Sequence, residues 1–220
     1  KFQMSEAPTI LFNASKKEAG NPNSTLKKLV RKIKGSYKPG LNKEEITLDR
    51  LKSVSLMVIA APKEPFSKSE LDSLKNFIEG GGNVFVLMTE GGETKNNTNV
   101  NYLLEQYGIN VNNDCVVRTS FYKYFHPKEA LIQNGILSQE VVRVANGRPK
   151  EEKAKKPSTQ FLSHVLHGKE DEGDEVDEKG LDFLYVNGAT LNVQSPSVPI
   201  LGSGSLCYPG SRPLGALYQG

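Results

Sequence analysis

The stretch from Leu56 to Glu93 constrains the fold more than any other part of this chain of 220 residues. It opens with an unbroken apolar run at 56–61, which is typical of a strand buried on both faces. A capping box formed by Ser67 and Glu70 begins a helix, whose apolar stripe consists of Leu71, Leu74, Phe77 and Ile78. Three glycines end this helix before a second apolar run at 84–88. A strand, a helix and a strand form a βαβ unit, so the sequence predicts an α/β fold with a mostly parallel central sheet flanked by helices.

The segment before this unit predicts a strand, a helix and a turn. Residues 9–12 form a short apolar run that predicts the first strand. We expect Ser24 or Thr25 to cap the helix that follows and Gly35 to end it. The apolar stripe of this helix is made of Leu26, Leu29, Val30 and Ile33. Its other face is basic and consists of Lys27, Lys28, Arg31, Lys32 and Lys34. Such a face is either a solvated surface or a docking surface for phosphate or an acidic partner. A Lys-Pro-Gly string within 37–41 predicts a turn.

Beyond the βαβ unit, polar residues at 89–99 predict a loop at the carboxyl end of a parallel strand, the edge where α/β sheets usually bind ligands. A helix over 100–107 follows, and its stripe is Val100, Leu103, Leu104 and Tyr107. We expect Thr98 or Asn99 to cap this helix and Gly108 to end it.

The remaining segments are less regular. A short strand pair or extension is expected at 109–118, and a short helix through Leu131 and Ile132. Residues 147–180 carry a basic block and then an acidic block with few apolar side chains, so they cannot offset the cost of ordering and predict a mobile charged insertion. An apolar run at 181–186 predicts another strand, and the short runs after it are expected to complete the same sheet. We therefore expect one domain over residues 1–220.

Composition narrows the class of protein. A net charge of +3 and a pI near 8.7 are too weak to indicate nucleic-acid binding. No apolar run approaches the ~20 residues that span a bilayer, and the N-terminus lacks a secretory signal, so we expect a soluble intracellular protein without membrane insertion. Cys115 and Cys207 are widely separated and are expected to be reduced thiols. Because the chain begins at Lys1 and stops after Gly220, we expect a fragment of a longer protein.

No catalytic motif is complete, and we expect a non-enzyme without cofactor or metal. The turn after Met88 lacks the serine or cysteine that a nucleophile elbow needs. His164 and His167 lie in the charged insertion and do not favour a metal site. Two alternatives stay open. A carbohydrate-binding module would use the loop of Thr89, Glu90, Gly91, Gly92 and Glu93 together with aromatic side chains. A hydrolase or amidotransferase would need a displaced nucleophile, Cys115 or Cys207.

Several long strings carry a resemblance to one family: ILFNASKKE, EGGGNVFVLMTEGGE, NTNVNYLLEQYGINVNNDCVVR, YKYFHPKEAL, FLYVNGATL and SRPLGALY. They are spread along the chain from residue 10 to residue 218, and none lies in the charged insertion. The sequence resembles the GIFT domain family of intraflagellar transport, which is named for its similarity to a bacterial gliding-motility transporter component and to sugar-binding or glycosidase-associated domains.

The resemblance implies a fold and a role. The implied fold is an α/β domain related to glutamine-amidotransferase-like domains, whose nucleophilic cysteine has no counterpart after Met88 here. The implied role is that of a non-catalytic structural subunit of the intraflagellar transport B complex, with other subunits of that complex as partners and carbohydrate disfavoured. The implied location is the cilium or flagellum, its base and the cytoplasm.

Protein binding requires a contact surface, and one aromatic segment is the best candidate. We expect contacts from Tyr122, Tyr124, Phe125 and His126, because aromatic side chains dominate interface energetics. The alternative for Phe125 and one tyrosine is a place in the core. The loop at 89–93 is the second candidate surface, as a vestigial ligand pocket.

Overall fold

A computed structural model describes residues 7–120, 126–145 and 182–220. Its centre is a four-stranded sheet in the order β2-β1-β3-β4, in which all neighbouring strands are parallel. The strands are β1 (Thr9–Asn13), β2 (Lys38–Asn42), β3 (Leu56–Ala60) and β4 (Asn83–Leu87). The predicted α/β class and parallel sheet are confirmed.

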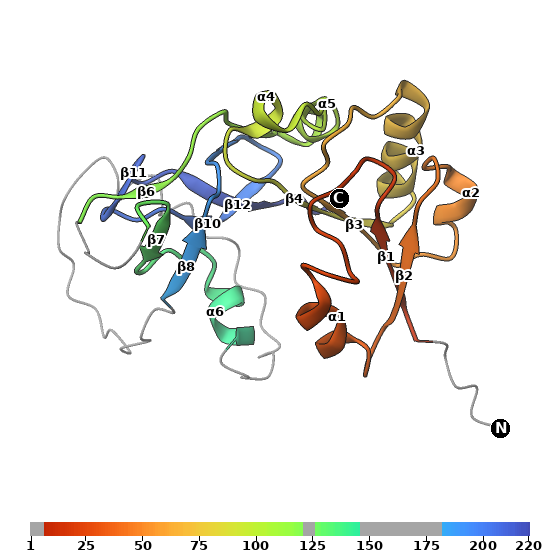
Figure 1. Ribbon diagram of the computed structural model, residues 1–220, viewed down its shortest axis with the longest axis horizontal. Helices are drawn as coiled ribbons and strands as arrows, with labels where there is room; N and C mark the ends of the chain where they lie inside the picture. Colours follow the sequence, from red (N-terminus) through yellow and green to blue (C-terminus); the bar gives the residue numbers. More distant parts are fainter. Residues whose placement is uncertain (1–6, 121–125, 146–181) are drawn as a thin grey trace.

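Helices pack on both faces of this sheet (Figure 1): α1 (Lys27–Ile33), α2 (Leu48–Leu51) and α3 (Lys68–Glu79). On one face, Leu74 and Phe77 of α3 and Leu51 of α2 join a buried cluster with Met57 and Ile59 of β3. On the other face, Leu26, Val30 and Ile33 pack against a second cluster, which consists of Ile10, Phe12, Val58 and Ala60. Strand β3 therefore supplies side chains to both faces, as its unbroken apolar run predicts.

Helix α3 begins and ends as the sequence predicts. The Ser67 hydroxyl accepts the Glu70 N–H at 3.3 Å, and the Glu70 carboxylate accepts the Ser67 N–H at 2.8 Å, so both halves of the capping box form. At the other end Gly81 adopts a φ of +87°, which only glycine reaches without strain.

Two predictions before the βαβ unit are wrong. Residues 38–42 form the edge strand β2 instead of a turn, since Pro39 lacks an N–H and an edge strand has one side free of ladder hydrogen bonds. No side chain caps α1, whose N-cap is Leu26. Thr25 instead donates its hydroxyl to the Ala19 carbonyl at 2.9 Å and accepts the Asn21 N–H at 2.8 Å.

The predicted loop at 89–99 contains the short helix α4 (Gly92–Asn96). It is followed by α5 (Asn101–Leu104) and a 3₁₀ turn, η1 (Glu105–Tyr107), where the longer helix was expected. Gly108 ends this pair with a φ of +76°, as predicted. Neither Thr98 nor Asn99 caps α5. The Asn99 side chain instead bonds the backbone of Phe66 in both directions, at 2.7 and 3.0 Å.

The rest of the described chain forms four antiparallel strand pairs, which we call the antiparallel region and which lie on the left in Figure 1. The pairs are β5 (Ile109–Val111) with β9 (Leu191–Val193), β6 (Val117–Arg118) with β11 (Cys207–Tyr208), β7 (Glu129–Ile132) with β8 (Phe183–Val186), and β10 (Val198–Gly202) with β12 (Pro213–Leu217). Helix α6 (Gln139–Ala145) completes this region.

Two further predictions are corrected here. The segment through Leu131 and Ile132 is a strand rather than a helix, and the last strands do not join the parallel sheet. The reason is a separate core, in which Val116, Ala130, Ile132, Cys207 and Leu214 are buried together. The C-terminal end still reaches the first part of the chain, because the Tyr218 ring lies 4.7 Å from that of Tyr107, which packs against the α3 cluster.

Some predictions fall outside the described residues: Tyr122, Tyr124, Phe125, His164, His167 and the charged insertion at 147–180. Within residues 7–120, 126–145 and 182–220, every helix is too short or too polar to cross a membrane.

Candidate functional site

The carboxyl ends of the four parallel strands meet at one edge of the sheet, where ligands of α/β proteins usually bind. In this chain the edge is built from the loops that follow β1, β2, β3 and β4. Buried polar side chains at this edge connect the loops to one another, as the contacts below show.

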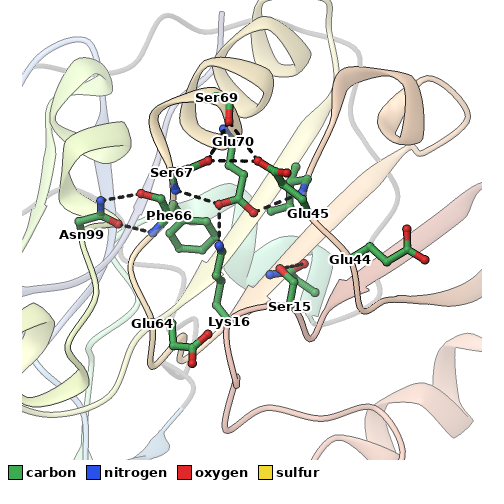
Figure 2. Close-up of polar contacts among 12 residues, drawn as sticks. Ser15, Lys16, Glu44, Glu45, Glu64, Phe66, Ser67, Ser69, Glu70 and Asn99 are labelled. Atoms are coloured by element: carbon green, nitrogen blue, oxygen red, sulfur yellow. Dashed lines mark hydrogen bonds and ion pairs between the residues drawn. The ribbon is translucent and has the colours of Figure 1, made fainter.

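The most buried charge at this edge is Glu70, whose carboxylate is fully inaccessible to solvent. Figure 2 shows the Lys16 ammonium, from the loop after β1, pointing at this carboxylate, with an N–O distance of 2.6 Å. The carboxylate also accepts the Ile46 N–H at 3.3 Å, and the Lys16 ammonium lies 5.5 Å from the centre of the Phe66 ring. This ion pair and the Ile46 hydrogen bond therefore join the loops after β1 and β2 to the first turn of α3, the helix that follows β3.

Opposing effects set the pKa of the Glu70 carboxyl. Burial raises this pKa, while the hydrogen bond from Lys16 and the two backbone N–H groups of Ser67 and Ile46 lower it. The net result is a pKa below the ordinary value of 4.5, so the carboxylate stays charged and paired at neutral pH.

A second polar group lies beside this pair, at the ends of β1 and β2. The Asn42 amide donates to Asn13 Oδ1 at 2.9 Å, and the Asn13 amide donates in turn to Glu18. The Glu18 carboxylate also accepts the Lys16 N–H at 2.9 Å. Because each side chain bonds its neighbours, this group ties the loops together.

Ala61, at the turn after β3, has the backbone strain that is typical of a nucleophile elbow, but the side chain of alanine is only a methyl group. Ala61 is buried and adopts a φ of +54°, where a non-glycine residue is strained. Its N–H donates to the Leu87 carbonyl at 2.8 Å, and its own carbonyl accepts the Ala19 N–H at 3.0 Å. A methyl group cannot act as a nucleophile. The elbow position expected from the sequence is the turn after Met88, whereas the strained turn lies one strand earlier, after β3.

The loop at 89–93 holds Glu90 between two lysines. Its carboxylate pairs with Lys128 at 2.5 Å and with Lys95, and Cys115 also hydrogen-bonds to it. These contacts hold the pKa of the Glu90 carboxyl at about 2. Lys128 lies in the antiparallel region and Glu90 follows the parallel sheet, so this ion pair connects the two parts of the fold.

The other members of the loop are also engaged in structural contacts. Glu93 accepts the Asn101 N–H at 2.6 Å and thereby caps α5 from outside that helix. The Thr89 hydroxyl donates to Asn96 at 2.9 Å, and the Gly91 N–H donates to the Asp114 carbonyl at 2.7 Å. A side chain on Gly92 would come within 2.6 Å of the Asn112 carbonyl, so the loop packs closely against its neighbour. Its use as a carbohydrate or ligand pocket stays a prediction.

Neither cysteine is placed as an activated nucleophile. Burial, with a hydrogen bond to Glu90, raises the pKa of the Cys115 thiol to about 11, and burial also raises the pKa of Cys207. Both are free thiols. The described part of the chain holds no group of three His, Cys, Asp or Glu side chains that could bind a metal ion.

A groove of about 320 Å³ opens on the outer face of the antiparallel region. Its apolar side chains are Leu131, Leu184 and Leu206, whose exposed fractions are 47%, 55% and 51%. Leu131 and Leu184 are cross-strand partners on β7 and β8. The polar side chains of the groove are Arg118, Ser120, Glu129 and Gln133. An exposed sheet face is normally polar, so this apolar face is a candidate binding surface.

Described residues close to either end of the predicted contact segment, Ser120 and Glu129, line the groove. Ser120, which lines it, directly precedes residues 121–125, and the Arg118 N–H donates to the Pro127 carbonyl at 3.0 Å. His126 is exposed, and its Nδ1 accepts the Lys128 N–H at 3.1 Å. Sequence reasoning missed the groove because it expected a helix at 131–132. A strand assignment for EALI would have placed Leu131 on the outer face.

The fold and these sites define an α/β domain whose sheet edge is tied together by buried polar side chains. A family model of the IFT52 GIFT domain matches residues 9–220. The intraflagellar transport protein 52 homologues of human and mouse are each 41% identical over 211 residues, or 96% of this chain, and 45% and 46% of their lengths are covered. The chain belongs to the IFT52 GIFT domain family.

Solved structures agree with this assignment. The mmIFT52 N-terminal domain superposes with a TM-score of 0.77 at 40% identity, covering 96% of this chain and 80% of that one. A ThuA-like protein from Bacteroides uniformis matches with a TM-score of 0.50 at 11% identity, covering 98% and 76%, and so shows a likeness of fold alone. The chain spans just under half the length of the human and mouse relatives.

Proposed function

We propose that this chain is a non-catalytic assembly domain of the intraflagellar transport B complex, which binds other subunits of that complex in the cilium or flagellum, at its base and in the cytoplasm. Membership of the IFT52 GIFT family supports the transport role. The observation that carries the binding role is the exposed apolar groove of Leu131, Leu184 and Leu206.

The contacts of the sheet edge favour a scaffold over a ligand site. Glu70 and Glu90 are held by lysines, Glu93 caps a helix, and Ala61 occupies the strained turn. A carbohydrate-binding site would need carboxylates that are free to accept hydroxyl groups. The partners we propose are therefore protein subunits rather than carbohydrate or nucleic acid.

The proposed contact surface combines the groove with His126 and the adjacent predicted residues Tyr122, Tyr124 and Phe125. Apolar side chains in a groove with a polar rim are the usual anatomy of an interface centre. Truncation of such a central anchor typically costs about 2 kcal/mol or more, which weakens binding about thirtyfold.

The test is incorporation of the protein into a reconstituted complex B, measured by co-elution in size-exclusion chromatography. We compare Leu131→Ser/Leu184→Ser with Val198→Ser/Leu217→Ser, a pair with similar exposure and the same cross-strand pairing on β10 and β12. The first variant should reduce incorporation at least tenfold, and the second should not. Equal incorporation of both variants would reject the groove while keeping the assembly role, and no incorporation of the unchanged protein would reject the role itself.

A further inference from the structure

The positive charge of this chain is concentrated in one segment, residues 19–43. The chain carries 28 basic and 25 acidic side chains. Seven of the basic and none of the acidic side chains lie within 19–43, which leaves 21 basic and 25 acidic side chains in the rest of the chain. The net charge of +3 therefore depends on this one segment, and the remainder of the chain is net acidic.

Helix α1 carries most of this charge on a surface that we call the α1 cationic face. The face consists of Lys27, Lys28, Arg31, Lys32 and Lys34. All five side chains are exposed, and none of them forms an ion pair in the part of the chain that the structure describes. The face therefore holds a set of positive charges that the described fold does not neutralise.

Packing of the opposite side of α1 fixes the direction of this face. Leu26 and the α1 residues Val30 and Ile33 pack against the buried cluster of β1 and β3, on the side of the sheet opposite to α3 (Figure 1). At 3.6 residues per turn, these three positions place the centre of the cationic face on the side of α1 that points away from the sheet. The apolar stripe is used within the fold, and the charged side is left for an external contact.

The arrangement of charge on α1 does not stabilise the helix. Lys27 and Arg31, and likewise Lys28 and Lys32, are like charges at a spacing of four residues, which destabilises a helix. The segment 19–43 supplies no carboxylate that could offset this repulsion. A negatively charged partner on the face would relieve it.

The spacing of these charges fits an extended polypeptide. Lys28 and Lys32 are four residues apart, which is about 6 Å along the helix axis. In an extended chain alternate side chains point the same way and lie about 6.6 Å apart. An extended segment with Asp or Glu at alternate positions can therefore place successive carboxylates opposite successive turns of the α1 cationic face.

We propose that the α1 cationic face binds an extended segment of a partner protein that is rich in Asp or Glu. The choice of a protein as the partner rests on the proposed assembly role. Charge complementarity supports the choice of an acidic segment. Because the rest of the chain is net acidic, it repels such a segment elsewhere and directs it to α1.

Two other polyanions fit the face less well. Among the residues of α1 only Leu29 is an exposed apolar side chain, so the face offers little apolar surface for insertion into a lipid layer. The seven residues of α1 rise about 10 Å, which is too short for the many phosphate contacts that bind a protein to nucleic acid without sequence preference.

The experiment measures the binding of a labelled ten-residue peptide, (Glu-Ser)5, to the whole chain by fluorescence anisotropy at 50 mM NaCl. The matched peptide (Gln-Ser)5 should bind at least tenfold more weakly. At 500 mM NaCl binding of the acidic peptide should weaken at least fivefold, because the screening length falls from about 10 Å at 0.1 M to about 3 Å at 1 M. The α1 variant Lys28→Gln/Arg31→Gln/Lys32→Gln should weaken binding at least tenfold.

A control variant removes the same number and kind of charges from other surfaces. It is Lys63→Gln/Lys68→Gln/Arg212→Gln, whose three side chains are exposed and form no ion pair among the described residues. This variant should weaken binding less than twofold. The α1 variant should unfold at the same urea concentration as the unchanged chain or at a higher one, because it removes repulsion between like charges.

Several outcomes would overturn the proposal. These are an unchanged chain that does not bind the acidic peptide, equal weakening by the two triple variants, and binding that salt does not change. Tighter binding of phosphatidylcholine vesicles with 30% phosphatidylserine, or of a 20-base-pair DNA duplex, through the same three α1 side chains would also overturn it, since the partner would then be a lipid surface or nucleic acid. The assay contains no complex B, so its failure leaves the assembly role standing. The groove variant Leu131→Ser/Leu184→Ser should bind the peptide as the unchanged chain does.

Discussion

Replacement of Lys16 by methionine tests the buried ion pair at the sheet edge. The change removes a charge whose partner, Glu70, is fully buried, and it keeps an unbranched side chain that is only one atom shorter. Removing one partner of a buried pair costs about 3–5 kcal/mol. Glu70 keeps the N–H groups of Ser67 and Ile46, so we expect the lower limit, a loss of about 3 kcal/mol in the free energy of unfolding at pH 7.

The pH dependence of this loss identifies its cause. In the parent, the pKa of Glu70 lies below its ordinary value of 4.5, so the contribution to stability is present above pH 4.5 and is lost as the pH falls through the folded pKa. Without Lys16, burial raises this pKa, and the variant loses stability as the pH rises. The difference between the two proteins should therefore shrink to about 1 kcal/mol at pH 4, where the isolated carboxyl is protonated.

The assay is urea denaturation at pH 4 and pH 7 followed by far-UV circular dichroism, since the chain has no tryptophan to report by fluorescence. Lys17→Met is the control, because Lys17 forms an ion pair with Glu64 in which its side chain is 78% exposed. This variant should leave the denaturation midpoint essentially unchanged, because an ion pair in water contributes little to stability. A loss for Lys16→Met that is below about 1 kcal/mol at pH 7, or equal at both pH values, would refute the reasoning.

Three further outcomes follow from the structure. The pKa of Glu90 is about 2, so its contribution to stability should disappear between about pH 4.5 and pH 2, and Glu90→Gln should flatten this part of a stability–pH curve. Gly108→Ala should lower the free energy of unfolding by about 2 kcal/mol or more, because Gly108 has a φ of +76° and a Cβ would lie 2.3 Å from the Gln194 carbonyl oxygen. Gly35→Ala, which meets nothing within 4 Å, should be near neutral in the same denaturation assay. Native Cys115, with a pKa of about 11, should react with iodoacetamide at pH 7.5 more than tenfold slower than in urea, and rapid labelling of the native chain would restore the case for a nucleophile.

The central part of the fold could be predicted because its signals are local. The apolar run of β3, the capping box of α3 and the glycines after it each depend on residues within one or two turns of the chain. Strand β2 could not be predicted in this way. Its Lys-Pro-Gly string has the composition of a turn, and only pairing with β1 makes it an edge strand.

The candidate sites, like strand β2, could not be predicted where they depend on residues far apart in the sequence. Glu70 was identified as a capping residue, but its partner Lys16 lies 54 residues earlier in the sequence and has no local signal. Glu93 was proposed as a ligand residue, and the structure places it at the N–H of Asn101. The groove depends on the pairing of Leu131 with Leu184, two residues on opposite sides of the charged insertion.

The sequence alone therefore determined the α/β class, the βαβ unit and the resemblance to the GIFT family. These rest on periodicity, on capping and on long matching strings, which are properties of consecutive residues. The tertiary structure decided which strands share a sheet, that Ala61 occupies the strained turn, and which carboxylates are held by lysines. Such features depend on contacts between residues far apart in the chain, because burial and ion pairing are set by what the folded chain brings together.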